Sequence, residues 1–202
     1  MSSSLSQWGE WIAQARAGDA DARDRLFGAC RSFVAVAARV HMERRLQAKV
    51  DASDLVQQSL LEAHRGFDGF AGDTPQEWLG WLKQIVAHNA ADVIKHYRGA
   101  EKRDVGKELP LVSPDTGIDQ WDLTPADPSP SPSQIAIGLE RELILADALE
   151  QLPEDYREIL ILRSLQRLSF DEVANRMGRS RGACQMLWMR AVERLREMLG
   201  NE

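Results

Sequence analysis

The feature that most constrains the fold is a proline-rich stretch in the middle of the chain, residues 105–133. Six of the eight prolines fall there, at positions 110, 114, 125, 128, 130 and 132. Proline lacks the backbone N–H donor and restricts the residue before it, so no helix can run through Pro125–Ser133. A stretch of this length without hydrophobic periodicity is unusual inside one compact domain. We therefore expect a linker over 105–133, between an N-terminal domain, 5–104, and a C-terminal domain, 134–202.

The predicted linker also carries most of the charge imbalance of the chain. The formal net charge is −6, and residues 108–133 contain five acidic residues with no lysine or arginine. The remainder is close to neutral and contains local basic zones, which matter more for binding than the total. The most basic zone is 163–196, with eight arginines against three acidic residues.

Both domains are predicted to be all-α. Apolar residues recur at steps of three and four, and strand alternation is absent. Two capping boxes, Thr74–Glu77 and Ser169–Glu172, mark helix starts. We expect helices over 19–46, from Asp51 or Ser53 to Phe67, and over 74–98, 133–151, 153–165, 169–177 and 180–199.

Several classes of protein are disfavoured by the sequence. The longest apolar run, Phe33–Ala38, is far shorter than the roughly 20 residues that span a bilayer. No secretory signal is visible, so we expect a cytoplasmic protein without a membrane segment. Cys30 and Cys184 form neither a disulfide framework nor a metal motif. No catalytic motif is found and the four histidines lack metal-ligand spacing, so we expect neither an enzyme, nor a metal site, nor a cofactor.

Residues 169–191 have the pattern of a helix-turn-helix. A short helix ends near Gly178, which suits a left-handed turn residue, and Ser180 can cap the next helix. On that second helix one face is predicted to be buried, formed by Cys184, Trp188, Ala191, Leu195 and Met198. Spacing alone leaves ordinary helix packing as an equal alternative to DNA binding. The predicted DNA contacts are Arg176, Arg179, Ser180, Arg181, Gly182, Ala183, Gln185, Met186, Met189 and Arg190.

Two groups of segments resemble the extracytoplasmic-function (ECF) sigma factors, which are specificity subunits of bacterial RNA polymerase. The segments Leu152–Arg163, Leu168–Gly178 and Arg190–Arg196 are similar to region 4 of that family. The segments Asp54–Arg65, Phe67–Phe70 and Trp78–Asp92 are similar to region 2. Two family domains in the order of the family are more specific than either alone.

The region 2 resemblance implies a docking helix for core RNA polymerase. In the family, the helix that corresponds to Asp54, Leu55, Gln57 and Gln58 contacts the largest polymerase subunit. Leu55 would offer apolar area, and Asp51 would add an acceptor for a basic partner surface. Helix capping is an equally good explanation of Asp51 or Ser53.

The same resemblance implies that residues 67–74 and the following helix hold the melted −10 promoter element, while region 4 reads the −35 element. Single-stranded DNA is bound by aromatic faces and cations along the backbone. Core packing is the favoured alternative for the aromatic rings, and a hydrogen bond to Asp92 is an alternative for Asn89. The predicted contacts are Phe67, Asp68, Phe70, Lys83, His88, Asn89, Lys95, Tyr97, Arg98, Lys102 and Arg103.

The sequence therefore predicts a sigma factor of the ECF type that directs core RNA polymerase to promoter DNA. An anti-sigma factor is left open as a further partner. One alternative is a stand-alone helix-turn-helix regulator. Another is a protein-binding adaptor, which the apolar side chains of Met186 and Met189 favour.

Overall fold

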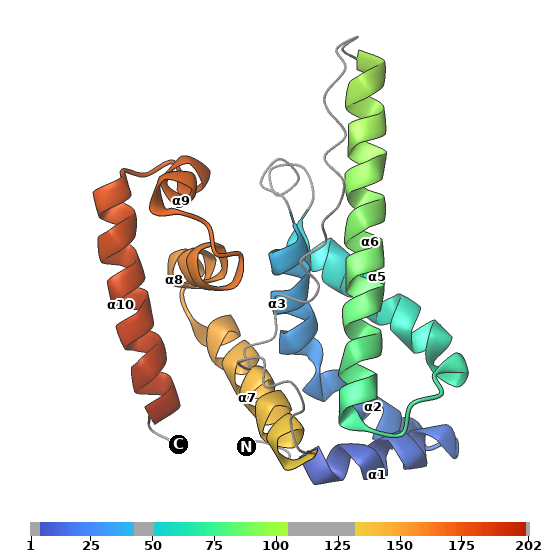
Figure 1. Ribbon diagram of the computed structural model, residues 1–202. Helices are drawn as coiled ribbons and strands as arrows, with labels where there is room; N and C mark the ends of the chain where they lie inside the picture. The colour runs from blue at the N-terminus through green and yellow to red at the C-terminus, as the bar shows by residue number, and fades with distance from the viewer. Residues whose placement is uncertain (1–4, 43–50, 105–131, 201–202) are drawn as a thin grey trace.

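The computed structural model describes residues 5–42, 51–104 and 132–200 (Figure 1). Over these ranges the chain is helical and contains no strand, which confirms the all-α prediction. The first part comprises α1 (Leu5–Arg16), α2 (Ala20–Ala29), α3 (Arg31–His41), α5 (Ala52–Gly66), the 3₁₀ turn η1 (Phe67–Gly69) and α6 (Pro75–Asp104). The second comprises α7 (Pro132–Gln151), α8 (Glu154–Leu160), the π-helical turn η3 (Ile161–Leu165), α9 (Phe170–Met177) and α10 (Arg181–Gly200).

Side chains at the first turns fix where the helices of the first part begin. Asp51 caps α5 by accepting a 2.9 Å hydrogen bond from the backbone N–H of Ser53, so the cap is Asp51 and not Ser53. Thr74 and Glu77 form the predicted capping box before α6, since each side chain accepts from the backbone of the other residue. The predicted starts of α5 and α6 are therefore confirmed.

The single helix predicted over 19–46 is wrong, because the chain turns at Cys30. There α2 ends and α3 begins, and the Cys30 thiol donates to the carbonyl of Phe27 at 3.3 Å. Helix α1, which is not among the predicted helices, packs against α2 across a turn at Gly18 (φ +95°), with Trp8 and Ile12 buried. The described part of α3 ends at His41, and residues 43–46 lie outside the described residues.

Helix α3 is the centre of the molecule. It packs against α5 and α6 within the first part and against α7 of the second. All six residues of the apolar run Phe33–Ala38 are buried. A helix that is covered on several sides needs apolar residues around its whole circumference, which explains why the longest apolar run of the chain lies here.

The helix-turn-helix is present as predicted. Ser169 and Glu172 form a complete capping box at the start of α9, and α9 ends at Gly178 with φ +64°. Glycine adopts this left-handed conformation without the steric cost of a Cβ. Ser180 starts the next helix by accepting a 3.2 Å hydrogen bond from the backbone N–H of Ala183.

The chain before α9 forms a π-helical turn that the sequence did not predict. The backbone N–H of Gln166 donates to the carbonyl of Ile161, five residues back, at 2.8 Å. Arg167 follows with φ +55°, an uncommon conformation for a residue other than glycine. This widened turn brings α9 back across the end of η3, so that α9 and η3 are in contact.

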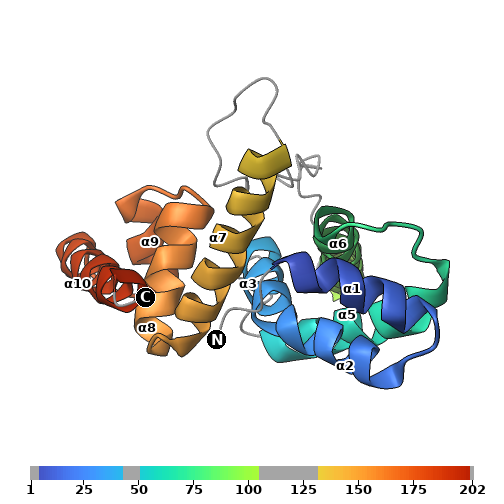
Figure 2. The same cartoon turned by 90° about the horizontal axis from the view of Figure 1, so that it is seen from below.

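The two parts touch each other directly. Helix α7 lies between α3 on one side and α8 and α10 on the other, as both views show (Figures 1 and 2). The predicted linker falls almost entirely on 105–131, outside the described residues. The division into two domains at these boundaries stays a prediction.

Candidate nucleic-acid interface

Helix α10 presents two contrasting faces. Cys184 and Ala191 are fully buried against the rest of the second part, and Trp188, Leu195 and Met198 are half-buried beside them. Every residue predicted to face DNA on this helix is exposed: Arg181, Gly182, Ala183, Gln185, Met186, Met189 and Arg190. The helix lies at the outer edge of the molecule, so that this face is open to a duplex (Figures 1 and 2).

The arginines near the start of α10 are engaged in polar contacts with α8, α9 and the turn before α9. Arg179 pairs with Asp155 of α8 at 2.6 Å, and Arg181 pairs with Asp171 of α9 at 3.4 Å. Arg176 donates to the side-chain oxygen of Gln166 at 2.7 Å. Exposed ion pairs of this kind contribute little to stability, so a phosphate can replace the carboxylate at small cost.

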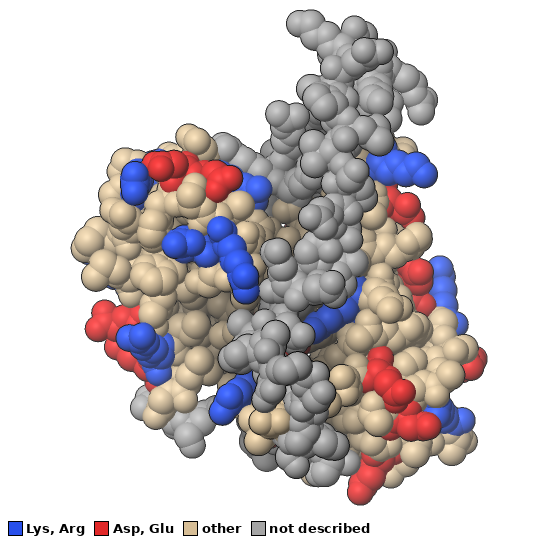
Figure 3. Space-filling view, viewed as in Figure 1, with Lys and Arg blue, Asp and Glu red and all other residues tan. Residues whose placement is uncertain are grey.

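Positive charge does not form one continuous field on this part. In the view of Figure 3, basic and acidic side chains lie next to one another over α8, α9 and α10. Arg190 differs from Arg179 and Arg181, because it is exposed and makes no ion pair or hydrogen bond among the described residues. Arg190 therefore offers a cation that no internal contact occupies.

The start of α5 exposes a short polar surface. Asp51, Asp54, Gln57 and Gln58 are all exposed, as a docking surface requires. The backbone hydrogen bond from Ser53 holds the pKa of Asp51 below its usual range, so that carboxylate is charged and already committed to the cap.

Leu55, in contrast, does not belong to that exposed surface. Its side chain is 2% exposed, so the expectation that it offers apolar area to a partner is wrong. Leu55 is part of the core between α5 and its neighbours.

The aromatic side chains of the loop after α5 are core residues in this structure. Phe67 and Phe70 are 2% and 8% exposed. Their rings meet Trp78 edge-on, with centroid distances of 5.7 and 5.3 Å. Because both rings are buried, they are not available to stack on unpaired bases, and the alternative of core packing holds. Asp68, between them, is exposed.

Two arginines that the sequence did not single out hold this loop in place. Arg16 of α1 pairs with Asp73 and donates to the carbonyl of Phe70 at 2.8 Å. Arg23 of α2 lies 4.8 Å from the ring centroid of Phe67. Gly72 is required for the same geometry, because a Cβ there would come within 2.6 Å of the Phe70 ring. Neither arginine belongs to a motif, so only the tertiary structure identifies them.

Some of the predicted DNA contacts on α6 are exposed, and others are bonded to the protein itself. Lys95 and His88 are exposed, and His88 lies 3.3 Å from Asp92. Asn89 is buried and donates to the hydroxyl of Ser59 at 3.3 Å, so its partner is Ser59 and not Asp92.

Lys83 is engaged by the second part of the chain. Its ammonium group lies 3.1 Å from Glu142 of α7 and 5.4 Å from the ring centroid of Phe33. Lys83 is therefore not presented to a nucleic acid in this arrangement. The predicted contacts Tyr97, Arg98, Lys102 and Arg103 lie outside the residues whose side chains are described.

The comparisons with known proteins agree with this architecture. Helices α9 and α10, joined by the short turn at Gly178, make this a helix-turn-helix protein. The family model "Sigma-70, region 4" matches residues 142–195. The RNA polymerase sigma factor CarQ of Myxococcus xanthus is 31% identical over 149 residues, which cover 74% of this chain and 75% of CarQ. The ECF RNA polymerase sigma factor SigD of Mycobacterium tuberculosis is 28% identical over 186 residues, covering 92% and 81%.

This chain belongs to the ECF family of RNA polymerase sigma factors. Among solved structures, the sigma factor RpoE of Bartonella quintana, in complex with the anti-sigma factor NepR, is 24% identical. That match covers 89% of this chain and 97% of RpoE with a TM-score of 0.31. Among the described residues, no helix has the length and apolar character that would let it cross a membrane.

Proposed function

We propose that this chain binds core RNA polymerase and selects promoters for it, with the 5–104 domain on the polymerase and the −10 element and the 134–202 domain on the −35 element. It acts by binding, without catalysing a reaction, in the cytoplasm. The observation that carries the proposal is the exposed face of α10, which follows a capped short helix and a left-handed Gly178. That geometry suits a recognition helix in the major groove.

The cations around α10 would position the helix on the duplex. Arg190 supplies an uncommitted cation, while Arg179 and Arg181 can exchange their exposed carboxylate partners for phosphates. Each phosphate neutralised in this way makes binding more sensitive to salt, by a slope of about −0.9 on a log–log plot.

Docking on polymerase would use the exposed polar residues of α5. Asp54, Gln57 and Gln58 are exposed and not tied to a cap, so they are available to a basic partner surface. Leu55 contributes indirectly, because its buried side chain anchors α5 in the core.

The −10 element would be held without the buried rings. The exposed groups are Asp68 and the backbone around Gly69, together with His88 and Lys95 of α6. Arg16 and Arg23 would act indirectly, since they fix the loop in one conformation. An anti-sigma factor remains a prediction from the family resemblance.

Run-off transcription tests the proposal. Core polymerase free of other sigma factors is incubated with a panel of promoters, once with the chain and once without it. We expect transcripts only when the chain is present. The absence of transcripts at every promoter, together with tight duplex binding by the chain alone, would favour the stand-alone regulator instead.

The docking surface has a matched control on the same helix. Asp54 and Glu62 are both exposed acidic residues of α5. Asp54→Ala is expected to weaken the binding of core polymerase at least tenfold, because it removes a charged acceptor from the contact. Glu62→Ala should leave binding unchanged, and equal affinities of the two variants would contradict the assignment.

A further inference from the structure

The middle of the outward face of α10 is apolar. Met186 and Met189 are 52% and 58% exposed, the most exposed large apolar side chains of this helix. They lie one turn apart and diametrically opposite the buried pair Cys184 and Ala191. Gly182, one turn earlier on the same line, carries no side chain, and the space where a Cβ would stand is open.

The groups that can form hydrogen bonds stand at the sides of this line. Gln185 is exposed on one flank and Arg190 on the other. Arg181, nearer the helix start, is tied to Asp171. The side chains that would enter a groove most deeply therefore cannot read hydrogen-bond donors or acceptors.

Only one base edge in the major groove offers an apolar group. Thymine carries a C5-methyl there, whereas guanine, adenine and cytosine present donors or acceptors. A thioether is flexible and polarisable and fits against a methyl group, but it leaves a polar edge without a hydrogen-bond partner. We propose that Met186 and Met189 read the C5-methyl groups of thymines in the −35 element, which rests on the proposed function.

A protein partner fits this face less well than DNA does. A stable protein interface buries at least about 1,000 Å² around an apolar centre. Here Gln185 and Arg190 flank the two methionines, and Glu193 follows one turn further along the same line, all of them exposed and polar. The apolar line is one side chain wide, which matches a row of methyl groups and not a protein surface.

The test removes single methyl groups from the DNA. A promoter is first selected from a randomised pool with core polymerase and the full chain. Each thymine of its −35 element is then replaced singly by deoxyuridine, which lacks only the C5-methyl. We expect one or two of these positions to lose about threefold to fivefold in open-complex formation, the effect of one buried methyl or methylene group.

Variants of the two methionines connect that loss to the protein. In Met186→Gln or Met189→Gln, thymine and deoxyuridine should become equivalent at the matching position, whereas Met→Leu at the same sites should keep the preference. Leu199→Ala, an exposed apolar residue of α10 away from this line, serves as the control and should keep the wild-type ratio.

The outcomes separate the inference from the proposed function. If the chain directs transcription but no thymine is sensitive to loss of its methyl, the inference is overturned and the function stands. The same holds if the thymine-to-deoxyuridine ratio of the wild type persists in both glutamine variants. If activity then also falls by the same factor on both templates, the methionines contact a protein. If the chain never directs transcription, the proposed function falls and the inference falls with it.

Discussion

At the scale of single residues, an aromatic cluster lies in the first part of the chain, between the loop after α5 and the start of α6. Phe67, Phe70 and Trp78 pack against one another, and Trp81 lies 5.1 Å from Phe70 between ring centroids. Arginines from α1 and α2 cover the outer side of Phe67 and Phe70. The rings therefore hold the backbone of this loop in one shape.

The first prediction follows from that burial. Phe67→Ala should lower the free energy of unfolding by about 3–5 kcal/mol, the cost of truncating a buried aromatic ring. Urea denaturation followed by circular dichroism measures it. Asp68→Ala, next to it and exposed, should leave the unfolding free energy within about 0.5 kcal/mol of wild type. A stable Phe67→Ala that fails only in promoter opening would restore a stacking role for the ring.

A second prediction concerns His41 at the end of α3. Burial lowers the pKa of His41 below its usual value of 6.5. The unfolded chain therefore binds this proton more readily, and the unfolding free energy falls as pH drops through about 6.5. Between about pH 7.5 and about pH 5.5, wild type should lose more unfolding free energy than His41→Gln. Parallel urea titrations at the two pH values test this, and identical losses would refute it.

At the scale of helices, sequence signals work where the interaction is local. A capping residue and its partner are three positions apart, so the boxes before α6 and α9 and the glycine after α9 could be predicted. The burial of Leu55 and the pairing of Lys83 could not be predicted, because the neighbours of both residues come from distant parts of the chain. The carboxylate that engages Lys83 is 59 residues away, and apolar spacing alone does not tell which turn of α5 is covered.

The capping box of α9 gives a third prediction. The hydroxyl and backbone N–H of Ser169 hydrogen bond to Glu172, which lowers the pKa of that carboxyl. Ser169→Ala removes the cap and should cost about 1 kcal/mol of unfolding free energy. Hydrogen exchange should show faster opening of α9 while α5 is unchanged. Ser169→Asp, which can still cap, is the control and should retain wild-type exchange in α9.

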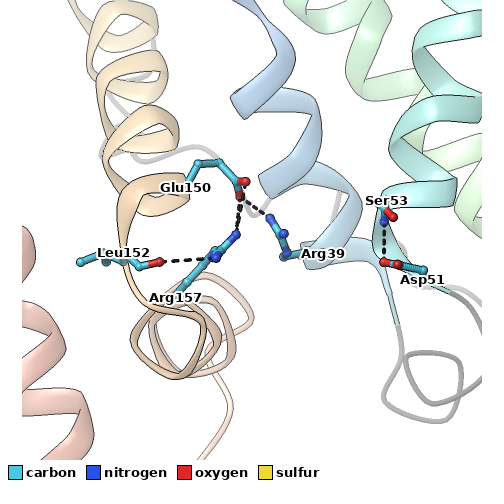
Figure 4. A network of polar contacts seen from close by, with 6 residues as sticks. All are labelled: Arg39, Asp51, Ser53, Glu150, Leu152 and Arg157. Atoms are coloured by element: carbon cyan, nitrogen blue, oxygen red, sulfur yellow. Dashed lines mark hydrogen bonds and ion pairs between the residues drawn. The ribbon is translucent and has the colours of Figure 1, made fainter.

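At the scale of the whole molecule, a polar network joins the two parts across α3 and α7. Glu150 of α7 accepts from Arg39 of α3 and lies 3.2 Å from Arg157 of α8 (Figure 4). Gln166 donates to the backbone carbonyl of Val40 near the end of α3 at 2.9 Å. Glu142 of α7 is 3% exposed and pairs with Lys83 of α6. These contacts hold the helices of the second part against those of the first.

The fourth prediction is that Glu142 controls this contact. Glu142→Gln removes the buried carboxylate that pairs with Lys83, and breaking a buried ion pair by neutralising one member is destabilising. The two parts should then separate, seen as a lower transfer efficiency between dyes on Glu62→Cys and Gln185→Cys. The native thiols should stay unlabelled, since burial raises the pKa of Cys30 to about 12 and also raises that of Cys184. Glu193→Gln, an exposed acid on α10, is the matched control. If Glu142→Gln and Glu193→Gln give the wild-type transfer efficiency alike, the α3–α7 contact does not depend on the Lys83–Glu142 pair.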